Sequence, residues 1–265
     1  MPTGQRGGTE TYWCTWGDST PEVMLIHCTL AHSGAWNGLV AHLNQPSLAF
    51  DLPDHGRSGP WEKSQDLQTQ SLAIARDFIT TPMDVIGHSF GATVALRLAI
   101  ESPHLVKRLV LIEPVLFAAA RGTAAFEEHL TMMRPMDEAM KAGDMETAAQ
   151  LFTGMWGTGV PWESMRPEHR TALQDQMHLV RAQDGSIFQD NAGLLTPDRL
   201  EAVDCPTLFV EGAESPPIIG AINEVLAGRM PNTARRKIPG AQHMAPITHD
   251  ALVADEIRSF WAANP

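Results

Sequence analysis

The fold of this 265-residue chain is decided by residues 83–100, MDVIGHSFGATVALRLAI. Within them, Gly87-His88-Ser89-Phe90-Gly91 matches G-x-S-x-G, with a strand pattern before it and a helical pattern after it. Glycines on both sides of Ser89 permit a turn so sharp that the hydroxyl stands above the carboxyl edge of a sheet. The N–H of Phe90 then points into an oxyanion hole at the start of the helix. The stretch predicts Ser89 as a nucleophile and His88 as a packing residue beside it.

Outward from this turn, short apolar runs alternate with helical patterns. Such alternation is typical of an α/β fold, a mostly parallel central sheet flanked by helices. Runs such as MLIH, LVLI and TLFV are apolar throughout, as expected for strands covered on both faces. The predicted strands are 11–16, 23–27, 47–51, 83–86, 108–112, 207–210 and 234–238. The predicted helices are 35–44, 67–80, 90–101, 217–229 and 246–262. We interpret residues 4–8 as a frayed tail.

Residues 115–190 break this alternation with a helical pattern that holds eight of the thirteen methionines. Prolines and glycines, Pro135 and Gly154 among them, are expected to divide the region into short helices. We predict a helical cap over 115–190, inserted into a core domain of residues 1–114 and 191–265. A cap rich in methionine and tryptophan offers an adaptable apolar wall. The predicted pocket residues are Trp36, Met132, Met136, Trp156 and Trp162.

Composition and charge restrict the partners. Hydrophobic residues make up 43% of the chain and charged residues 19%, an ordinary globular balance. The net charge of −12 argues against a nucleic acid or an anionic membrane, because phosphate groups would be repelled. Cys14, Cys28 and Cys205 form neither a disulfide framework nor a metal-ligand spacing. Since no signal peptide or membrane-spanning run is visible, we expect a cytoplasmic protein. We also expect that it uses neither a metal nor a cofactor. Its expected partner is a small-molecule substrate, and the sequence leaves open whether the protein forms a homo-oligomer.

Three more segments join the serine motif. They are His27-Cys28-Thr29, the stretch DLPDHGRSG at 51–59, and PGAQH at 239–243. With them the chain resembles the α/β-hydrolase superfamily over nearly its whole length. The first segment resembles the family's His-Gly-x oxyanion loop, the second its D-x-P-G-x-G-x-S loop, and the third its last-strand histidine loop. By position, the resemblance assigns the second oxyanion N–H to Thr29, while His27 is interpreted as a buried residue that shapes the loop.

The sequence departs from the family at two glycines. Cys28 and Asp54 stand where the family usually has glycine. A side chain at position 28 implies that the first oxyanion loop is less open than usual.

A serine hydroxyl needs an adjacent base to take its proton. His243 lies in a glycine-containing loop after the last predicted strand, whereas His249 falls inside the helix that follows, so the chain order favours His243. Two glutamates compete for the acid that orients this histidine. Glu214 lies in the loop where the family usually places its acid, one position early. Glu113 ends the strand after the nucleophile helix, where certain haloalkane dehalogenases place theirs, and we favour Glu113.

These features predict a serine hydrolase. It would cleave a carboxylic ester or lactone of a small to medium, mostly apolar substrate through an acyl-enzyme. One alternative is a carbon–carbon bond hydrolase or lyase that uses the same residues. Another is a ligand-binding receptor that turns over slowly. Haloalkane dehalogenase and epoxide hydrolase are disfavoured, because both need an aspartate where Ser89 stands.

Overall fold

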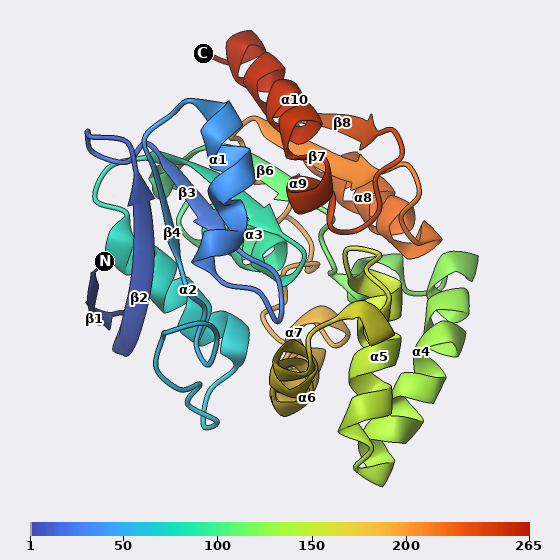
Figure 1. Ribbon diagram of the computed structural model, residues 1–265. Helices are drawn as coiled ribbons and strands as arrows, with labels where there is room; N and C mark the ends of the chain where they lie inside the picture. The colour runs from blue at the N-terminus through green and yellow to red at the C-terminus, as the bar shows by residue number, and fades with distance from the viewer. Residues whose placement is uncertain (1) are drawn as a thin grey trace.

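A computed structural model describes residues 2–265, and an eight-stranded sheet forms its centre (Figure 1). The strand order is β1-β2-β4-β3-β5-β6-β7-β8. Neighbours from β4 to β8 run parallel, while β1 with β2 and β2 with β4 are antiparallel. The strands are β1 (Thr3–Arg6), β2 (Thr9–Trp16), β3 (Val23–Ile26), β4 (Ser47–Phe50), β5 (Met83–His88), β6 (Val106–Ile112), β7 (Thr207–Gly212) and β8 (Thr233–Ile238). The predicted mostly parallel α/β sheet is confirmed.

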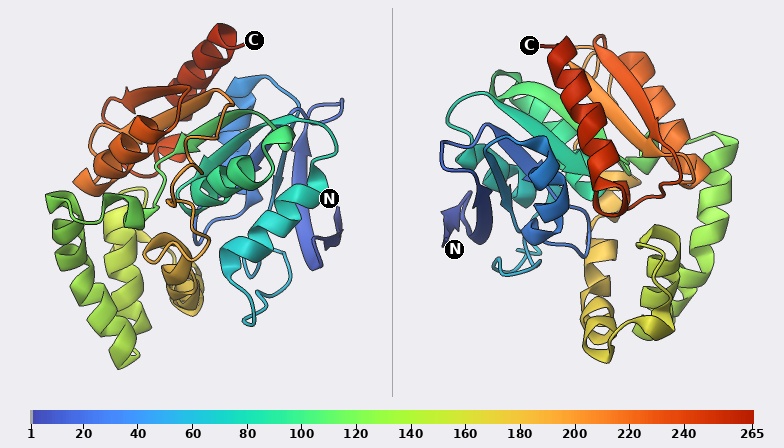
Figure 2. Two further views of the ribbon diagram at one scale, coloured as in Figure 1. Left: turned by 180° about the vertical axis from the view of Figure 1, so that it is seen from behind. Right: turned by 45° about the horizontal axis from the view of Figure 1, so that its top comes forward.

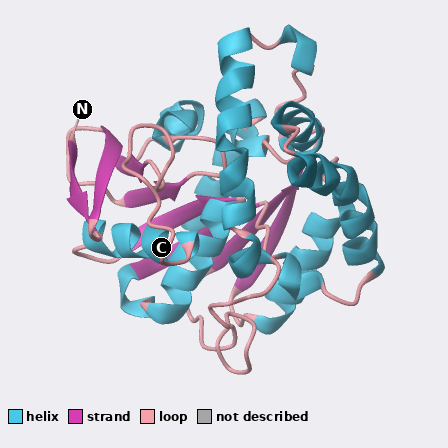
Figure 3. Cartoon of the chain, turned by 90° about the horizontal axis from the view of Figure 1, so that it is seen from below, coloured by secondary structure: helices cyan, strands magenta, loops and turns pink. Residues whose placement is uncertain are grey.

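Helices cover both faces of the sheet, as Figure 3 shows from below. One face packs against α2 (Leu67–Phe78), α3 (Phe90–Glu101) and α8 (Pro217–Arg229), and the other against α1 (Asn37–Leu43) and α10 (Asp250–Ala263). Strand β3 serves both sides. Its residues alternate, because successive side chains of a strand point to opposite faces: Met24 and Ile26 join the first apolar cluster, whereas Val23 and Leu25 join the second.

The amino-terminal segment corrects the expectation of a frayed tail. Thr3–Arg6 forms strand β1, and Arg6 pairs with Thr9 across a two-residue turn. Gly7 and Gly8 have φ of 54° and 83°, which a tight hairpin turn requires and which glycine adopts without steric cost. The Gly-Gly pair was therefore the signal of a hairpin.

Two helices also differ from prediction. Helix α4 (Ala124–Ala142) continues through Pro135, which was expected to break it. Proline removes one helical N–H donor, but Pro135 and Thr131 four residues before it are both exposed, so the carbonyl left without that donor faces solvent. The predicted helix 246–262 is divided into α9 (Ala245–Thr248) and α10, because His249 between them leaves the helical conformation with φ of −135°.

A third group of helices stands off from the sheet, as Figures 1 and 2 show. It contains α4, α5 (Met145–Trp156), α6 (Pro167–Ala182) and the short α7 (Asp184–Ile187). Gly154 lies inside α5 and does not end it. These helices have an apolar cluster of their own, which includes Met133, Met136 and Met177. The predicted division of the chain at residues 115 and 190 stays a prediction. Among residues 2–265, no helix is both long and apolar enough to cross a membrane.

Candidate active site

The turn between β5 and α3 holds Ser89 in a strained conformation. Its φ is 56° and its ψ is −118°, outside the regions that side-chain-bearing residues normally occupy. A Cβ at Gly87 would lie 2.4 Å from the carbonyl oxygen of Gly91, and a Cβ at Gly91 would lie 2.2 Å from that of Ile26. The structure therefore needs glycine at both positions, as the sequence motif predicted.

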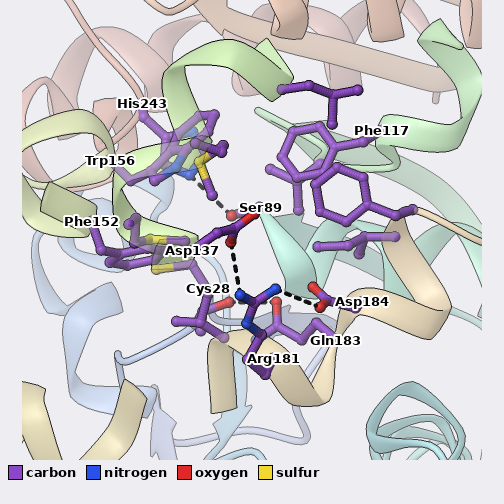
Figure 4. A pocket seen from close by; sticks show the side chains of 18 of the residues that line it. Cys28, Ser89, Phe117, Asp137, Phe152, Trp156, Arg181, Gln183, Asp184 and His243 are labelled. Carbon is purple, nitrogen blue, oxygen red and sulfur yellow. Dashed lines mark hydrogen bonds and ion pairs between the residues drawn. The ribbon is translucent and has the colours of Figure 1, made fainter. Parts of the chain in front are cut away.

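Ser89, His243 and Glu113 form one chain of hydrogen bonds. The Ser89 Oγ hydroxyl donates to His243 Nε2 at 3.0 Å, and His243 Nδ1–H donates to Glu113 Oε2 at 3.0 Å. All three residues are buried, Glu113 completely. The carboxylate accepts only, so it holds the ring proton on Nδ1 and leaves Nε2 free to accept from the serine. Figure 4 shows His243 above Ser89 in the site.

Glu113 is tied down on its other side as well. Its Oε1 accepts from the backbone N–H of Gly212 at 2.6 Å and from the Ser215 hydroxyl at 2.7 Å. Its φ of 51° is a further sign of a backbone held in place by its surroundings. Glu214, the alternative acid, is exposed, and its backbone N–H bonds to Ala241 O. The structure thus brings Glu113, and not Glu214, to His243.

His88 steadies the loop that carries His243. Its Nε2–H donates to the backbone carbonyl of His243 at 2.9 Å, and the two rings lie 5.1 Å apart. Burial, helped by the neighbouring His243, lowers the pKa of His88 to about 3. A neutral ring therefore makes this contact. His249, the rival base, instead lies before α10, where its Nδ1 bonds to the Thr248 hydroxyl.

The loop after β3 lies against the nucleophile turn. Its anchor is His27, whose Nδ1–H donates to Cys28 O at 2.7 Å while its Nε2 accepts from Leu52 N–H at 2.9 Å. Burial lowers the pKa of His27 well below its usual value, so the ring is neutral and both bonds are satisfied. This matches the interpretation of His27 as a residue that shapes the loop.

The two predicted oxyanion residues, Phe90 and Thr29, lie in different surroundings. The side chain of Phe90 is fully buried in the core, and its N–H lies in the first turn of α3, where no earlier carbonyl is available. Thr29 lines the cavity beside Ser89. Its hydroxyl donates to Gln183 Oε1 at 2.8 Å, a link to the end of α6 that sequence patterns did not indicate.

A cavity of about 260 Å³ opens over Ser89 and His243. Of the predicted pocket residues, Met136 and Trp156 line it. The prediction was wrong for three others, which lie outside the lining. Met132 is exposed, because it sits one residue before Met133 on α4, and its side chain points about 100° around the helix axis from that of Met133, which lines the cavity.

The other two misplaced residues are tryptophans. Trp36 is buried among the residues of α1 and α10, where its ring lies 6.3 Å from that of His88. Trp162 is buried in the apolar cluster of the outer helices. Large apolar side chains reach cores more often than clefts, and the sequence pattern does not distinguish the two.

Sequence reasoning also missed most of the cavity wall. Phe117, Phe152 and Phe188 line it, from three separate segments of the chain. Cys28 lines it too, and burial raises the pKa of this thiol to about 12. No periodic signal joins residues so far apart in the sequence. Within residues 2–265, no group of three or more His, Cys, Asp or Glu side chains is arranged to hold a metal ion.

Comparison with known proteins identifies the family of the chain. Residues 23–256 match the model of the alpha/beta hydrolase family, so the chain belongs to that family. It is similar to an esterase of Mycobacterium tuberculosis, with 29% identity over 76% of this chain and 68% of the relative. It is also similar to a pimeloyl-[acyl-carrier protein] methyl ester esterase of Neisseria meningitidis, with 36% identity over 92% of this chain and 77% of the relative.

Solved structures agree on the fold. An alpha/beta hydrolase from Sphaerobacter thermophilus superposes with a TM-score of 0.72 and 21% identity, covering 98% of this chain and 100% of the other. A thermophilic esterase superposes with a TM-score of 0.73 and 20% identity, covering 99% and 97%.

Proposed function

We propose that this protein is a serine esterase that cleaves a carboxylic ester or lactone of a small to medium, mostly apolar substrate through an acyl-enzyme. The hydrogen-bond chain from Ser89 through His243 to Glu113 carries the proposal. Relatives named as esterases and lipases support ester bonds as the target. The serine at position 89 also suits acyl transfer, in which a hydroxyl attacks a carbonyl carbon.

In the first half of the reaction, His243 Nε2 takes the proton of Ser89 as Oγ attacks the ester carbonyl. The imidazolium that forms keeps its Nδ1–H on Glu113, which stabilises the positive charge without taking the proton. The tetrahedral oxyanion accepts hydrogen bonds from the N–H groups of Phe90 and Thr29. Each such donor contributes about 3–4 kcal/mol in comparable sites. His243 then protonates the leaving alcohol.

In the second half, His243 takes a proton from water, and the resulting hydroxide attacks the acyl carbonyl. Collapse of the second oxyanion returns the proton to Ser89 and releases the acid. The cavity wall suits an apolar acyl or alcohol group, because Phe117, Met133 and Trp156 line it. Trp156 stands edge-on to His243 with ring centroids 4.6 Å apart, so it also shields the reacting atoms from water.

The test is covalent labelling. The purified protein is treated with a fluorophosphonate, and its intact mass is read beside that of Ser89→Ala. We expect one adduct on the wild type and none on the variant, followed by turnover of short-chain p-nitrophenyl esters. A folded wild type that takes no adduct would overturn the proposal and favour a binding protein. Labelling at Ser89 with turnover of a 1,3-diketone, and little turnover of simple esters, would favour a carbon–carbon bond hydrolase.

A further inference from the structure

One end of the cavity is polar, although most of its wall is apolar (Figure 4). Arg181 on α6 lies there between Asp137 on α4 and Asp184 on α7. Its Nη2 lies 3.0 Å from Asp137 Oδ1, and its Nη1 lies 3.3 Å from Asp184 Oδ2. The three side chains are each about a third exposed, at 36–37%. We call these three residues the polar end.

The charges of the polar end do not cancel. Two carboxylates face one guanidinium, which leaves a net charge of −1 on the cavity wall. Burial raises the pKa of Asp184; Arg181 opposes that shift and Asp137 adds to it. A substrate carboxylate placed here would be a third anion, and an ammonium group, which has donors only, would have no acceptor to offer the guanidinium.

Hydrogen-bond capacity narrows the choice further. A guanidinium has five N–H donors, of which the two aspartates take only some, and each carboxylate can accept more than one bond. The polar end therefore offers donors and acceptors side by side. A secondary amide matches both, since its carbonyl accepts from Arg181 while its N–H donates to Asp137 or Asp184.

We propose that the polar end is a specificity site for an uncharged group that accepts and donates hydrogen bonds, such as a secondary amide, and that it disfavours carboxylates. This inference rests on the proposed esterase function, since the group belongs to the ester that Ser89 attacks. The apolar residues Met133, Phe152 and Val180 share the cavity with the polar end. They hold the alkyl part of the substrate while the polar group reaches the charged residues.

The experiment compares three p-nitrophenyl esters of equal acyl length that end in methyl, N-methylamide or carboxylate. We expect kcat/KM for the amide to exceed that for the methyl ester about tenfold, the effect of one good hydrogen bond. The carboxylate should be the poorest, about tenfold below methyl. In the double variant Asp137→Asn/Asp184→Asn, Arg181 keeps its charge but loses both neighbouring anions. The ester that ends in carboxylate should then have the highest kcat/KM of the three. Glu138→Gln, next to Asp137 on the exposed side of α4, should keep the wild-type order.

The outcomes separate the two proposals. Labelling of Ser89 with equal rates on all three esters, or with the carboxylate preferred by the wild type, overturns the specificity site and leaves the esterase intact. An unchanged order in the double variant overturns it as well. If Ser89 takes no label, the esterase proposal fails. Calorimetric binding of p-nitrobenzyl ethers with the same three ends then ranks them independently, and the wild-type ranking decides even if the variant does not fold.

Discussion

Replacing Glu113 with glutamine tests the acid directly. Oε1 accepts from Gly212 and Ser215, and the Gly212 N–H is part of the backbone and cannot reorient. The glutamine oxygen therefore stays on that side, and its NH2 group faces His243 Nδ1. Two donors then oppose each other, so the ring moves its proton to Nε2 and presents a donor to Ser89 in place of an acceptor. The serine loses its base while the site keeps its shape.

The expected loss is large. An enzyme with the wrong histidine tautomer loses about 10⁴-fold in kcat, which is about 5.5 kcal/mol of transition-state stabilisation. The assay is kcat and KM on a p-nitrophenyl ester, with near-ultraviolet circular dichroism to confirm the native fold. Glu214→Gln is the matched control, because Glu214 is exposed, and it should stay within twofold of wild type. Activity of Glu113→Gln within tenfold of wild type, or loss in Glu214→Gln, would refute the assignment.

Three further predictions concern buried groups around the site. His88→Phe keeps a ring but removes the donor to His243 O; kcat should fall about tenfold with KM unchanged, and an unaltered kcat would contradict a positioning role. His129 stacks on Phe117 at 4.3 Å, has no hydrogen-bond partner for either ring nitrogen within residues 2–265, and has its pKa lowered by burial to about 4. The unfolded chain thus binds more protons between pH 4 and 6.5, so stability falls as pH drops through that window, by up to about 3 kcal/mol. In urea unfolding at pH 7 and pH 5, His129→Phe should be about 1–3 kcal/mol more stable at pH 7 and should lose less at pH 5; equal losses in both proteins would show that His129 is not responsible. The Cys28 thiol, with a pKa of about 12 through burial, should resist iodoacetamide at pH 8 until the protein is denatured, because little of the reactive thiolate forms; rapid labelling of the native protein would show that the thiolate is populated at that pH.

Local signals account for what was predicted well. The turn around Ser89 depends on glycines at two fixed neighbouring positions, so a five-residue motif carries its geometry. The seven predicted strands lie within two residues of their observed ends. Five of them, β3 to β7, are largely buried strands with parallel neighbours, whose apolar runs are easy to recognise. The hairpin turn at Gly7 and Gly8 also had a local signal, the pair of glycines, but we interpreted residues 4–8 as a frayed tail.

The cavity was predicted less well for a physical reason. Its wall collects residues from the segments that follow β3, β5, β6 and β8 and from α4 to α7, and periodicity describes one element at a time. A methionine-rich helix indicates an apolar face, but which side of it meets the cavity depends on the helix's rotation about its axis. That rotation admits Met136 and turns Met132 to solvent.

By itself, the sequence determined the nucleophile turn, the parallel sheet and the order in which Ser89 and His243 follow along the chain. Only the tertiary structure decided between the two glutamates. Glu113 and His243 are 130 residues apart, and they meet because β6, β7 and β8 are neighbours whose carboxyl ends share one edge of the sheet. The positive φ of Glu113 and its bonds to Gly212 and Ser215 aim the carboxylate at the histidine. These contacts are non-local, so they exist only once the strands have paired.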